Sequence, residues 1–482
     1  MSRAPRQGMP RRRRGTSVSP ARSAALNAAL LTAKRGKPLD GALEHVLAAE
    51  KVSHRDRRLA GEIAFGSVRH RASIDMILSS VSSRPVQDIQ AAALEALRQA
   101  IYQTFYLERI PEHAAVGEAV QLVRNLAGGK VAGFTNAVLR AALRLRSCRE
   151  SISESAREPR SELSFRSGEV IRLSRELLPD PEVDTAGWLA AHYSYPRELV
   201  AQLLSELDRR EVDQVLAWGN EIPHLGARVN CLRSGDPALL AGSPDELCGP
   251  GKVFAGCSGA VALDLPGAYC ISPEQEIGSL PGLRKGLFSI QDETQQRVAA
   301  ALAPKAGERI LDICAAPGGK SMHMAELSGG GAKIVACDPD AQRLALVEDS
   351  AARLGFSCVQ TRRLEVPPLP SELAGTFDAV LADVPCSNTG SMNRRVESRW
   401  RVSSAATARL VDLQLGILKA AAGAVRKRGR LVYSTCSILS SENFGVVREF
   451  LASAGDARLL KEELTLPRAG RRDGGYFAVL EP

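Results

Sequence analysis

The sequence predicts a multidomain fold, with an all-α N-terminal domain, a small α+β linking subdomain and a C-terminal α/β domain. At 482 residues, the chain is longer than one hydrophobic core usually supports. Apolar residues recur at steps of three and four through residues 22–147, which is the period of amphipathic helices. From Gln291 onward, apolar runs alternate with helical patterns, as they do where crossover helices join parallel strands.

Composition sets the expected boundaries between these parts. Residues 1–37 hold ten Arg or Lys and no acid, so we expect a solvated, disordered tail or, alternatively, an arm that binds RNA electrostatically. Residues 149–162 are polar and nearly free of large apolar side chains, a composition typical of linkers. The expected parts are a basic tail at 1–20, a helical domain at 21–150, a linker at 151–180, a linking subdomain at 181–290 and the α/β domain at 291–482.

The overall charge favours an anionic partner. The net charge is +9 and the pI is about 9.1, which favours nucleic acid over a membrane surface. No uncharged run of about 18 apolar residues occurs, so no transmembrane helix is expected. Without a signal-peptide pattern we expect a cytoplasmic protein with reduced thiols. The ten cysteines form no C-x-x-C pair and the seven histidines show no ligand spacing, so no metal site is expected.

Within the α/β domain the chemistry is expected at the ends of strands. Ligands of open α/β sheets bind beyond the carboxyl ends of the strands, so a loop after the first strand and cysteines after two later strands should face one crevice. We expect strands near 308–313, 333–338, 377–383 and 429–435, and helices near 318–327, 340–354, 405–424 and 441–453.

The loop after the first strand reads Cys314-Ala-Ala-Pro-Gly-Gly-Lys320. Its small residues let the backbone approach a ligand, and a following helix N-terminus favours negative charge. A structural turn, a phosphate-binding loop and a site for a nucleoside-bearing methyl donor are the competing interpretations. A phosphate loop would need glycine at position 314, and the dinucleotide pattern G-x-G-x-x-G is absent.

Asp338 ends the second strand, about 20 residues past these glycines. A carboxylate at this position can accept hydrogen bonds from both hydroxyls of a ribose. Aspartate is also a favoured N-cap, so Asp338 could instead begin the next helix. The glycine-rich loop before it favours the ribose interpretation.

Two cysteines follow later strands, in Asp383-Val-Pro-Cys386 and in Tyr433-Ser-Thr-Cys436. The carboxylate of Asp383 can accept from the exocyclic amine of cytosine or, if protonated, donate to a ring nitrogen; it could also only cap a turn. A cysteine such as Cys386 is, taken alone, more often a small buried residue. Cys436 lies beside hydroxyl groups, and a nearby Lys or helix terminus would favour its thiolate as a nucleophile.

These groups suit methyl transfer to a pyrimidine. Carbon 5 of cytosine is a poor nucleophile, but addition of a thiolate at C6 makes it enamine-like. Hydrogen bonding at N3 stabilises the charge that develops. Carbon 5 can then attack a sulfonium methyl group, after which loss of the C5 proton and elimination of the thiol restore aromaticity. A second thiol could assist that release. The base must be flipped or single-stranded to be reached.

Taken together, these segments resemble the RsmB (Sun/Fmu) branch of the NOP/Sun RNA cytosine-C5 methyltransferases. The donor loop is similar over 312–321, the substrate loop over 383–390 with Arg394, Arg395 and Trp400, and the nucleophile motif over 434–438 followed by Glu442-Asn443. Gln291-Asp292 and residues 473–477 resemble flanking family segments. The helical domain resembles the NusB-like domain of this branch in five segments: Asp56-Arg57, 66–69, 110–113, 118–120 and 133–140.

The resemblance implies a Rossmann-like methyltransferase domain, S-adenosylmethionine as cofactor, a cytosine of 16S rRNA as substrate and a monomer. It implies that Cys436 is the nucleophile, that Cys386 aids product release, and that Lys320 and Asp383 contact the base. The residues implied to hold the cofactor are Cys314, Ala315, Ala316, Pro317, Gly318, Gly319, Lys320, Asp338 and Asp383.

The sequence departs from the family pattern at two places. The family usually has an acid near the adenine of the donor. At that place this chain has the sequence Thr361-Arg-Arg-Leu-Glu-Val366, and Glu365 is the candidate substitute. Arg395-Val-Glu397 replaces a more usual Arg-x-Pro-Asp stretch.

Three other functions compete with this interpretation. One is a tRNA cytosine-C5 methyltransferase, against which the NusB-like domain argues. Another is a non-catalytic RNA-binding or transcription factor, which the joint presence of Lys320, Asp383, Cys386 and Cys436 disfavours. The last is a phosphate-loop nucleotidase.

Overall fold

The computed structural model describes residues 18–35, 38–49, 52–151, 159–166, 168–234, 253–274, 276–468 and 472–482. Most of the predicted basic tail and Cys248 lie outside these ranges. The chain divides into two compact units, Met1–Arg197 and Glu198–Pro482, and each is described by itself.

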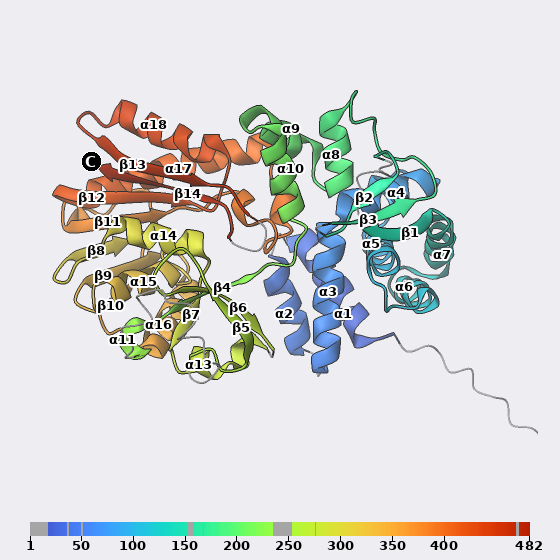
Figure 1. Cartoon of the computed structure of the whole chain (residues 1–482), viewed down its shortest axis with the longest axis horizontal. Helices are drawn as coiled ribbons and strands as arrows, with labels where there is room; N and C mark the ends of the chain where they lie inside the picture. The colour runs from blue at the N-terminus through green and yellow to red at the C-terminus, as the bar shows by residue number, and fades with distance from the viewer. Residues whose placement is uncertain are drawn as a thin grey trace, which may run out of the picture. The chain divides into compact units, whose positions relative to one another are not determined.

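The first unit is mainly helical, as the apolar periodicity predicts. Its central helix is α5 (Ala91–Tyr106), in which every residue from Ala96 to Tyr106 is buried, so that the other helices pack around it. The remaining helices, coloured blue to green in Figure 1, are α1 (Pro20–Arg35), α2 (Leu39–Ala49), α3 (His54–Arg69), α4 (Arg71–Val81), α6 (Glu112–Ala127), α7 (Gly129–Leu143) and α8 (Thr185–Tyr193), with a short 3₁₀ turn at Val86–Asp88.

The segment expected to be a linker differs from the expectation. It contributes to a three-stranded antiparallel sheet in the order β1 (Arg146–Ser151), β3 (Glu169–Leu173), β2 (Glu162–Ser164). The described apolar side chains Leu163, Phe165 and Ile171 are buried in the same core as the helices. The polar residues 152–158, which dominate the composition of this stretch, lie outside the described residues. Composition alone therefore indicates a linker because these strands are short and contain few apolar residues.

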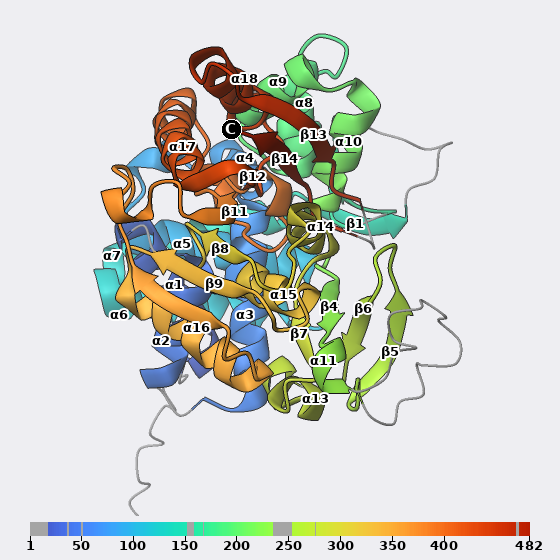
Figure 2. The same cartoon turned by 90° about the vertical axis from the view of Figure 1, so that its left-hand side faces the viewer.

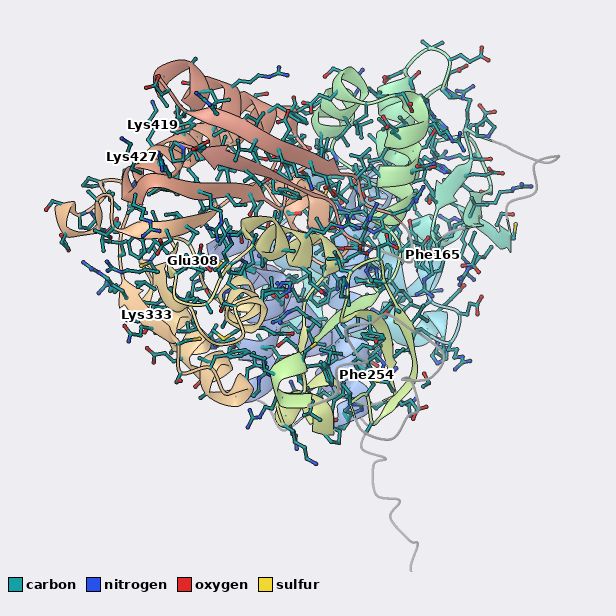
Figure 3. All side chains as sticks on the ribbon, turned by 60° about the vertical axis from the view of Figure 1, so that its left-hand side comes forward. Phe165, Phe254, Glu308, Lys333, Lys419 and Lys427 are labelled. Atoms are coloured by element: carbon teal, nitrogen blue, oxygen red, sulfur yellow. The ribbon has the colours of Figure 1, made fainter. Side chains whose placement is uncertain are left out.

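The second unit begins with α9 (Arg197–Glu206) and α10 (Arg209–Trp218), followed by a small antiparallel sheet. The strand order is β5 (Cys257–Ala262), β6 (Ala268–Pro273), β4 (Leu225–Val229), β7 (Phe288–Ile290), with short helices α11 (Cys231–Ser234) and α13 (Pro281–Arg284) and a 3₁₀ turn at Ile277–Ser279. Phe254, labelled in Figure 3, packs with Tyr269 and Phe288 to form its core. These elements fall in the predicted linking subdomain.

The larger sheet of this unit has seven strands in the order β10-β9-β8-β11-β12-β14-β13. The first five strands in this order are parallel, whereas β14 is antiparallel to both of its neighbours, β12 and β13. The strands are β8 (Arg309–Asp312), β9 (Lys333–Asp338), β10 (Val359–Arg363), β11 (Phe377–Asp383), β12 (Val425–Thr435), β13 (Arg458–Thr465) and β14 (Gly475–Glu481). The four predicted strands are present. The alternation of strands and helices does not predict the pair β13–β14, because no helix separates them and most side chains of β13 are exposed.

Helices cover both faces of this sheet (Figures 1 and 2). On one face α14 (Glu293–Leu302), α15 (Gly319–Leu327) and α16 (Ala341–Leu354) pack on the side chains of Ile310, Ile334 and Leu381. On the other, α17 (Ser404–Ala424) and α18 (Phe444–Ser453) pack on Leu311 and Val380. Neighbouring residues of a strand point to opposite faces, so near-continuous apolar strands are what a doubly covered sheet requires.

The described residues contain no helix that is long and apolar enough to cross a lipid bilayer. Within the same ranges, no group of three or more His, Cys, Asp or Glu has an arrangement that could hold a metal ion.

Packing in the first unit gives a test with a matched control on one helix. A Cβ added at Gly66 of α3 would lie 1.9 Å from Cζ of Tyr102, whereas one at Gly61 would meet nothing closer than Leu43 Cδ2 at 3.9 Å. We expect Gly66→Ala to destabilise the packing of α3 on α5 by about 1–3 kcal/mol. Gly61→Ala should be neutral or stabilise α3 by up to about 1 kcal/mol.

Hydrogen–deuterium exchange of the α3 and α5 peptides in the full chain measures both effects. Faster exchange is expected in Gly66→Ala alone. Equal exchange in the two variants would contradict the predicted contact with Tyr102.

Candidate functional site

The predicted site residues lie beyond the carboxyl ends of three adjacent parallel strands. In the ladder, Asp312 at the end of β8 is paired with Leu381 of β11, and Asp383 at the end of β11 is paired with Ser434 of β12. Cys436 follows directly after β12. The opposite edge, where these strands begin, carries Glu308, Lys333 and Lys427, whose side chains are labelled in Figure 3.

Lys320 and Asp383 form the charged pair at the centre of the site. The Nζ atom of Lys320, on the first turn of α15, lies 2.7 Å from Oδ2 of Asp383, while Oδ1 of Asp383 accepts a 2.6 Å hydrogen bond from the hydroxyl of Ser434. Lys320 is 8% exposed. Burial acts to lower the pKa of Lys320, but the charge and hydrogen bond of Asp383 together with the negative charges of Cys436 and Asp312 outweigh it, and the pKa is raised above the usual value. Lys320 is therefore held as an ammonium ion.

The two cysteines are brought into contact. The backbone N–H of Cys436 donates to Sγ of Cys386 over 3.3 Å. A side-chain hydrogen bond between the thiols, acting with the positive charge of Lys320, lowers the pKa of Cys436 against the effect of burial. The same hydrogen bond, together with burial, raises the pKa of Cys386 well above its usual value. Of the two cysteines, Cys436 is thus the one favoured as the thiolate and Cys386 the one favoured as the thiol.

One buried carboxylate ties the two cysteine loops together. Glu442, in the short 3₁₀ turn Ser440–Glu442, has no exposed surface. It accepts hydrogen bonds from the backbone N–H of Ser387 at 2.9 Å and from the hydroxyl of Ser437 at 2.5 Å. The hydroxyl of Ser387 and the amide of Gln414, the latter at 3.0 Å, also donate to it. Ser387 and Ser437 directly follow the two cysteines, so Glu442 fixes both loops at once.

The glycine-rich loop adopts a conformation that depends on its small residues. Gly318 has φ +103°, and a Cβ there would lie 3.2 Å from the backbone of Val347 on α16. The N–H of Ala315 donates to the carbonyl of Cys337 over 2.7 Å. The loop is therefore held tightly against β9 and α16. Gly319, in contrast, is exposed and has only Gln291 Nε2 near its Cβ position, at 3.8 Å.

Acidic groups surround this loop. Asp312 is buried and accepts a 2.6 Å hydrogen bond from the hydroxyl of Ser321, but within the described residues its Oδ1 atom has no hydrogen-bond partner. Burial raises the pKa of Asp312 to about 7. Asp338 is 2% exposed; it accepts from the N–H of Asp340 at 3.0 Å and pairs with Arg343 at 3.1 Å. Arg343 also donates to the carbonyl of Ala316 over 2.6 Å, which links the two segments.

The structure excludes the interpretation of Asp338 as a helix N-cap. The N-cap of α16 is Asp340, whose carboxylate accepts from the N–H groups of Gln342 and Arg343. Asp338 is therefore not the cap, and its carboxylate stays at the end of β9. Glu365 lies in the loop after β10, where its side chain is exposed.

A second ionic cluster fixes the segment that follows the Cys386 loop. Arg394 donates to Asp473 over 2.7 Å and lies 3.4 Å from Asp292, which His224 approaches to 3.2 Å. Burial and the negative charge of Asp292 raise the pKa of Asp473 to about 6. The family resemblance drew attention to Arg394, Asp292 and Asp473 as motif residues, but their mutual contact is visible only in three dimensions. His224 carried no signal in the sequence.

Comparison with known proteins gives a consistent result. Residues 299–474 match a family model described as 16S rRNA methyltransferase RsmB/F, and residues 19–144 match the NusB family. The chain is 30% identical over 468 residues to "Ribosomal RNA small subunit methyltransferase B" of Shigella sonnei (strain Ss046), which covers 95% of this chain and 98% of that protein. The protein of the same name from Escherichia fergusonii is 30% identical over 471 residues, with the same coverage. The crystal structure of PH0851 shares the fold, with a TM-score of 0.73 over 97% of this chain and 99% of that chain at 21% identity.

The buried carboxylate of Glu442 generates a prediction. In Glu442→Gln, one acceptor oxygen becomes a donor that faces other donors, so we expect a loss of about 2–3 kcal/mol in the free energy of unfolding. Both cysteine loops should also lose their fixed positions. Glu449→Gln, on the exposed side of α18, is the matched control and should unfold like the parent chain.

Urea unfolding of both variants measures the difference. Peptide-resolved alkylation of Cys386 and Cys436 should also become faster in Glu442→Gln. Indistinguishable unfolding of the two variants would rule out a structural role for this carboxylate.

Proposed function

The chain belongs to the RsmB/F family of S-adenosylmethionine-dependent rRNA methyltransferases, and we propose that it methylates C5 of a cytosine in 16S rRNA. The observation that carries this proposal is the contact between Cys436, whose pKa is lowered, and Cys386, whose pKa is raised. Both lie beside the ion pair of Lys320 and Asp383. Cys436 is the proposed nucleophile, and Cys386 acts in product release. We further propose that the enzyme acts as a monomer.

The groups around the glycine-rich loop fit S-adenosylmethionine. This cofactor supplies an electrophilic methyl group on a positively charged sulfur and also carries an ammonium group. The carboxylates of Asp312, Asp338 and Asp383 lie at the ends of neighbouring strands. The Oδ1 atom of Asp312, which has no hydrogen-bond partner among the described residues, is suited to a cationic ligand. We assign the loop residues Cys314–Lys320 and Asp338 to the cofactor, with Asp338 bound to the ribose.

Glu365 is the acid available on the adenine side of this site. Arg363 of β10 is paired with Asp338 of β9, so Glu365 follows two residues beyond the strand end that lies beside Asp338. An acid in that position can accept from an amino group. We therefore keep Glu365 as the proposed substitute for the usual family acid.

The side chains of the site divide the work of the reaction. The thiolate of Cys436 adds to C6 of the cytosine, and the ammonium group of Lys320 stabilises the negative charge that develops on the ring. Asp383 accepts from the exocyclic amine and keeps Lys320 in place. Carbon 5 then takes the methyl group that the bound cofactor would supply, and its proton passes to solvent as the bond between C6 and Sγ of Cys436 breaks. Elimination of Cys436 restores the ring, and the protonated thiol of Cys386 is placed to assist this step.

The nucleophile assignment is tested by Cys436→Ser. Transfer of labelled methyl to unmodified 16S rRNA should fall ~10³-fold or more, because a serine hydroxyl stays protonated and adds poorly to C6. Cofactor binding by calorimetry should be unchanged. tRNA is run beside the 16S rRNA, and bisulfite sequencing maps the product. Full turnover by Cys436→Ser would refute the nucleophile assignment, and label on tRNA alone would move the substrate to tRNA.

The release role is tested by Cys386→Ala. We expect a covalent complex with RNA, visible as a shifted band on a denaturing gel under turnover conditions, because the bond between Cys436 and C6 forms but is not broken. Cys358→Ala, which changes a cysteine just before β10, is the control and should give no shifted band. If Cys386→Ala turns over without any band, Cys386 is not needed for release.

A further inference from the structure

Gln295 lies between the two reactive groups of the site, although no motif draws attention to it. It stands in the first turn of α14. Its Oε1 atom accepts a hydrogen bond from Nζ of Lys320, and its Nε2 atom donates to Sγ of Cys436 over 3.0 Å. Gln295 is half-buried. One amide therefore touches both the proposed nucleophile and the ammonium group beside it.

The orientation of this amide is dictated by chemistry. A lysine ammonium group has three donors and no acceptor, so only the carbonyl oxygen of Gln295 can face Lys320. The NH₂ group is then directed to the other side, where Sγ of Cys436 lies. A donor that is fixed in this way favours the thiolate over the thiol, since a thiolate is the stronger acceptor.

The backbone around Gln295 is anchored on both sides. Asp292 caps α14 by accepting from the N–H of Thr294 at 2.9 Å. The hydroxyl of Thr294 donates to the carbonyl of Asp473 over 2.7 Å, and the amide of Gln296 donates to the carbonyl of Gln291 over 3.0 Å. The position of Gln295 is thus set by its neighbours, and its own side chain is left for the site.

We propose that Gln295 is a positioning residue. Its Nε2 donor holds Sγ of Cys436 in place, and its Oε1 acceptor links the same amide to the ammonium group of Lys320. This inference rests on the proposed function, because it assigns a role relative to the nucleophile. It adds a group from α14 to a site whose other members follow β8, β11 and β12.

Other charged and titratable groups also face Cys436. Cys386 donates a hydrogen bond to it, Lys320 attracts the thiolate, and Asp383 repels it. The hydrogen bond from Gln295 acts with the hydrogen bond from Cys386 and the positive charge of Lys320 to lower the pKa of Cys436. Removing the Gln295 donor therefore moves the pKa of Cys436 upward, and adding a negative charge at the same place moves it further in that direction.

Two variants separate these effects. Gln295→Met keeps the length of the side chain but removes both polar contacts. Gln295→Glu keeps the contact with Lys320, removes the donor to sulfur and adds a negative charge. Gln360→Met, on the exposed face of β10, is the matched control.

The direct measurement is the rate of alkylation of Cys436 by iodoacetamide between pH 5 and pH 10, followed by mass spectrometry of the tryptic peptide 431–448, in which Cys436 is the only cysteine. We expect the midpoint to rise by about one pH unit in Gln295→Met and by more in Gln295→Glu. The single-turnover rate near pH 7 should fall about tenfold and recover as the pH rises. Calorimetric affinity for S-adenosylmethionine should not change.

The outcomes are distinguishable. An unchanged alkylation midpoint in both Gln295 variants would overturn the proposal, as would a fall in rate that is equal at every pH, since that is the signature of a structural effect alone. If the parent enzyme methylates neither 16S rRNA nor tRNA, the proposed function fails, but the alkylation midpoints still decide the relation between Gln295 and Cys436.

Discussion

The site depends on a single buried carboxylate. Cys386 and Cys436 follow different strands, yet the backbone N–H of Cys436 reaches Sγ of Cys386. Glu442 makes this arrangement stable because it is fully buried and accepts from groups that directly follow each cysteine. A buried charge without donors is costly. If either loop moved alone, Glu442 would lose donors, so the two loops hold a common position. The hydroxyl of Tyr433, bonded to the carbonyl of Glu442 at 2.6 Å, fastens the same turn to β12.

Around this fixed pair, the charges are arranged so that the two thiols differ. The negatively charged groups around Lys320, among them Asp383 at 2.7 Å, keep its pKa raised although burial acts to lower it. The ammonium group of Lys320 acts to lower the pKa of Cys436, whereas the hydrogen bond with Cys436 and burial raise the pKa of Cys386. The two thiols therefore differ in pKa, which is lowered for Cys436 and raised for Cys386. A thiolate is the nucleophilic form of cysteine, so this difference suits Cys436 rather than Cys386 to the proposed role of nucleophile.

Much of the fold and site could be predicted from the sequence, for a physical reason. Buried strands and amphipathic helices leave a periodic pattern, and parallel strands bring their carboxyl ends to one edge, so Lys320, Asp383 and the two cysteines could be placed together before any coordinates. The ribose and capping roles of Asp338 could not be separated, since Asp340 is an equally good cap two residues later. Gln295 and His224 gave no signal, because their importance comes only from what the fold places beside them. The strands around Leu163 and Ile171 are short and flanked by polar residues, which hides them.

The acidic surroundings of the glycine-rich loop have a cost for stability. The pKa of Asp312 is raised from 3.8 to about 7 by burial, so between these values the folded chain binds more protons than the unfolded chain. The free energy of unfolding therefore decreases as the pH rises through that window. Near neutral pH the ionised form of Asp312 is a carboxylate that burial destabilises, with one oxygen unpaired within the described residues. A cationic ligand beside this carboxylate offsets part of the free-energy cost of burying it, and this favours binding by the same amount. Burial of Asp312 therefore both lowers the stability of the fold near neutral pH and suits this carboxylate to a sulfonium cofactor.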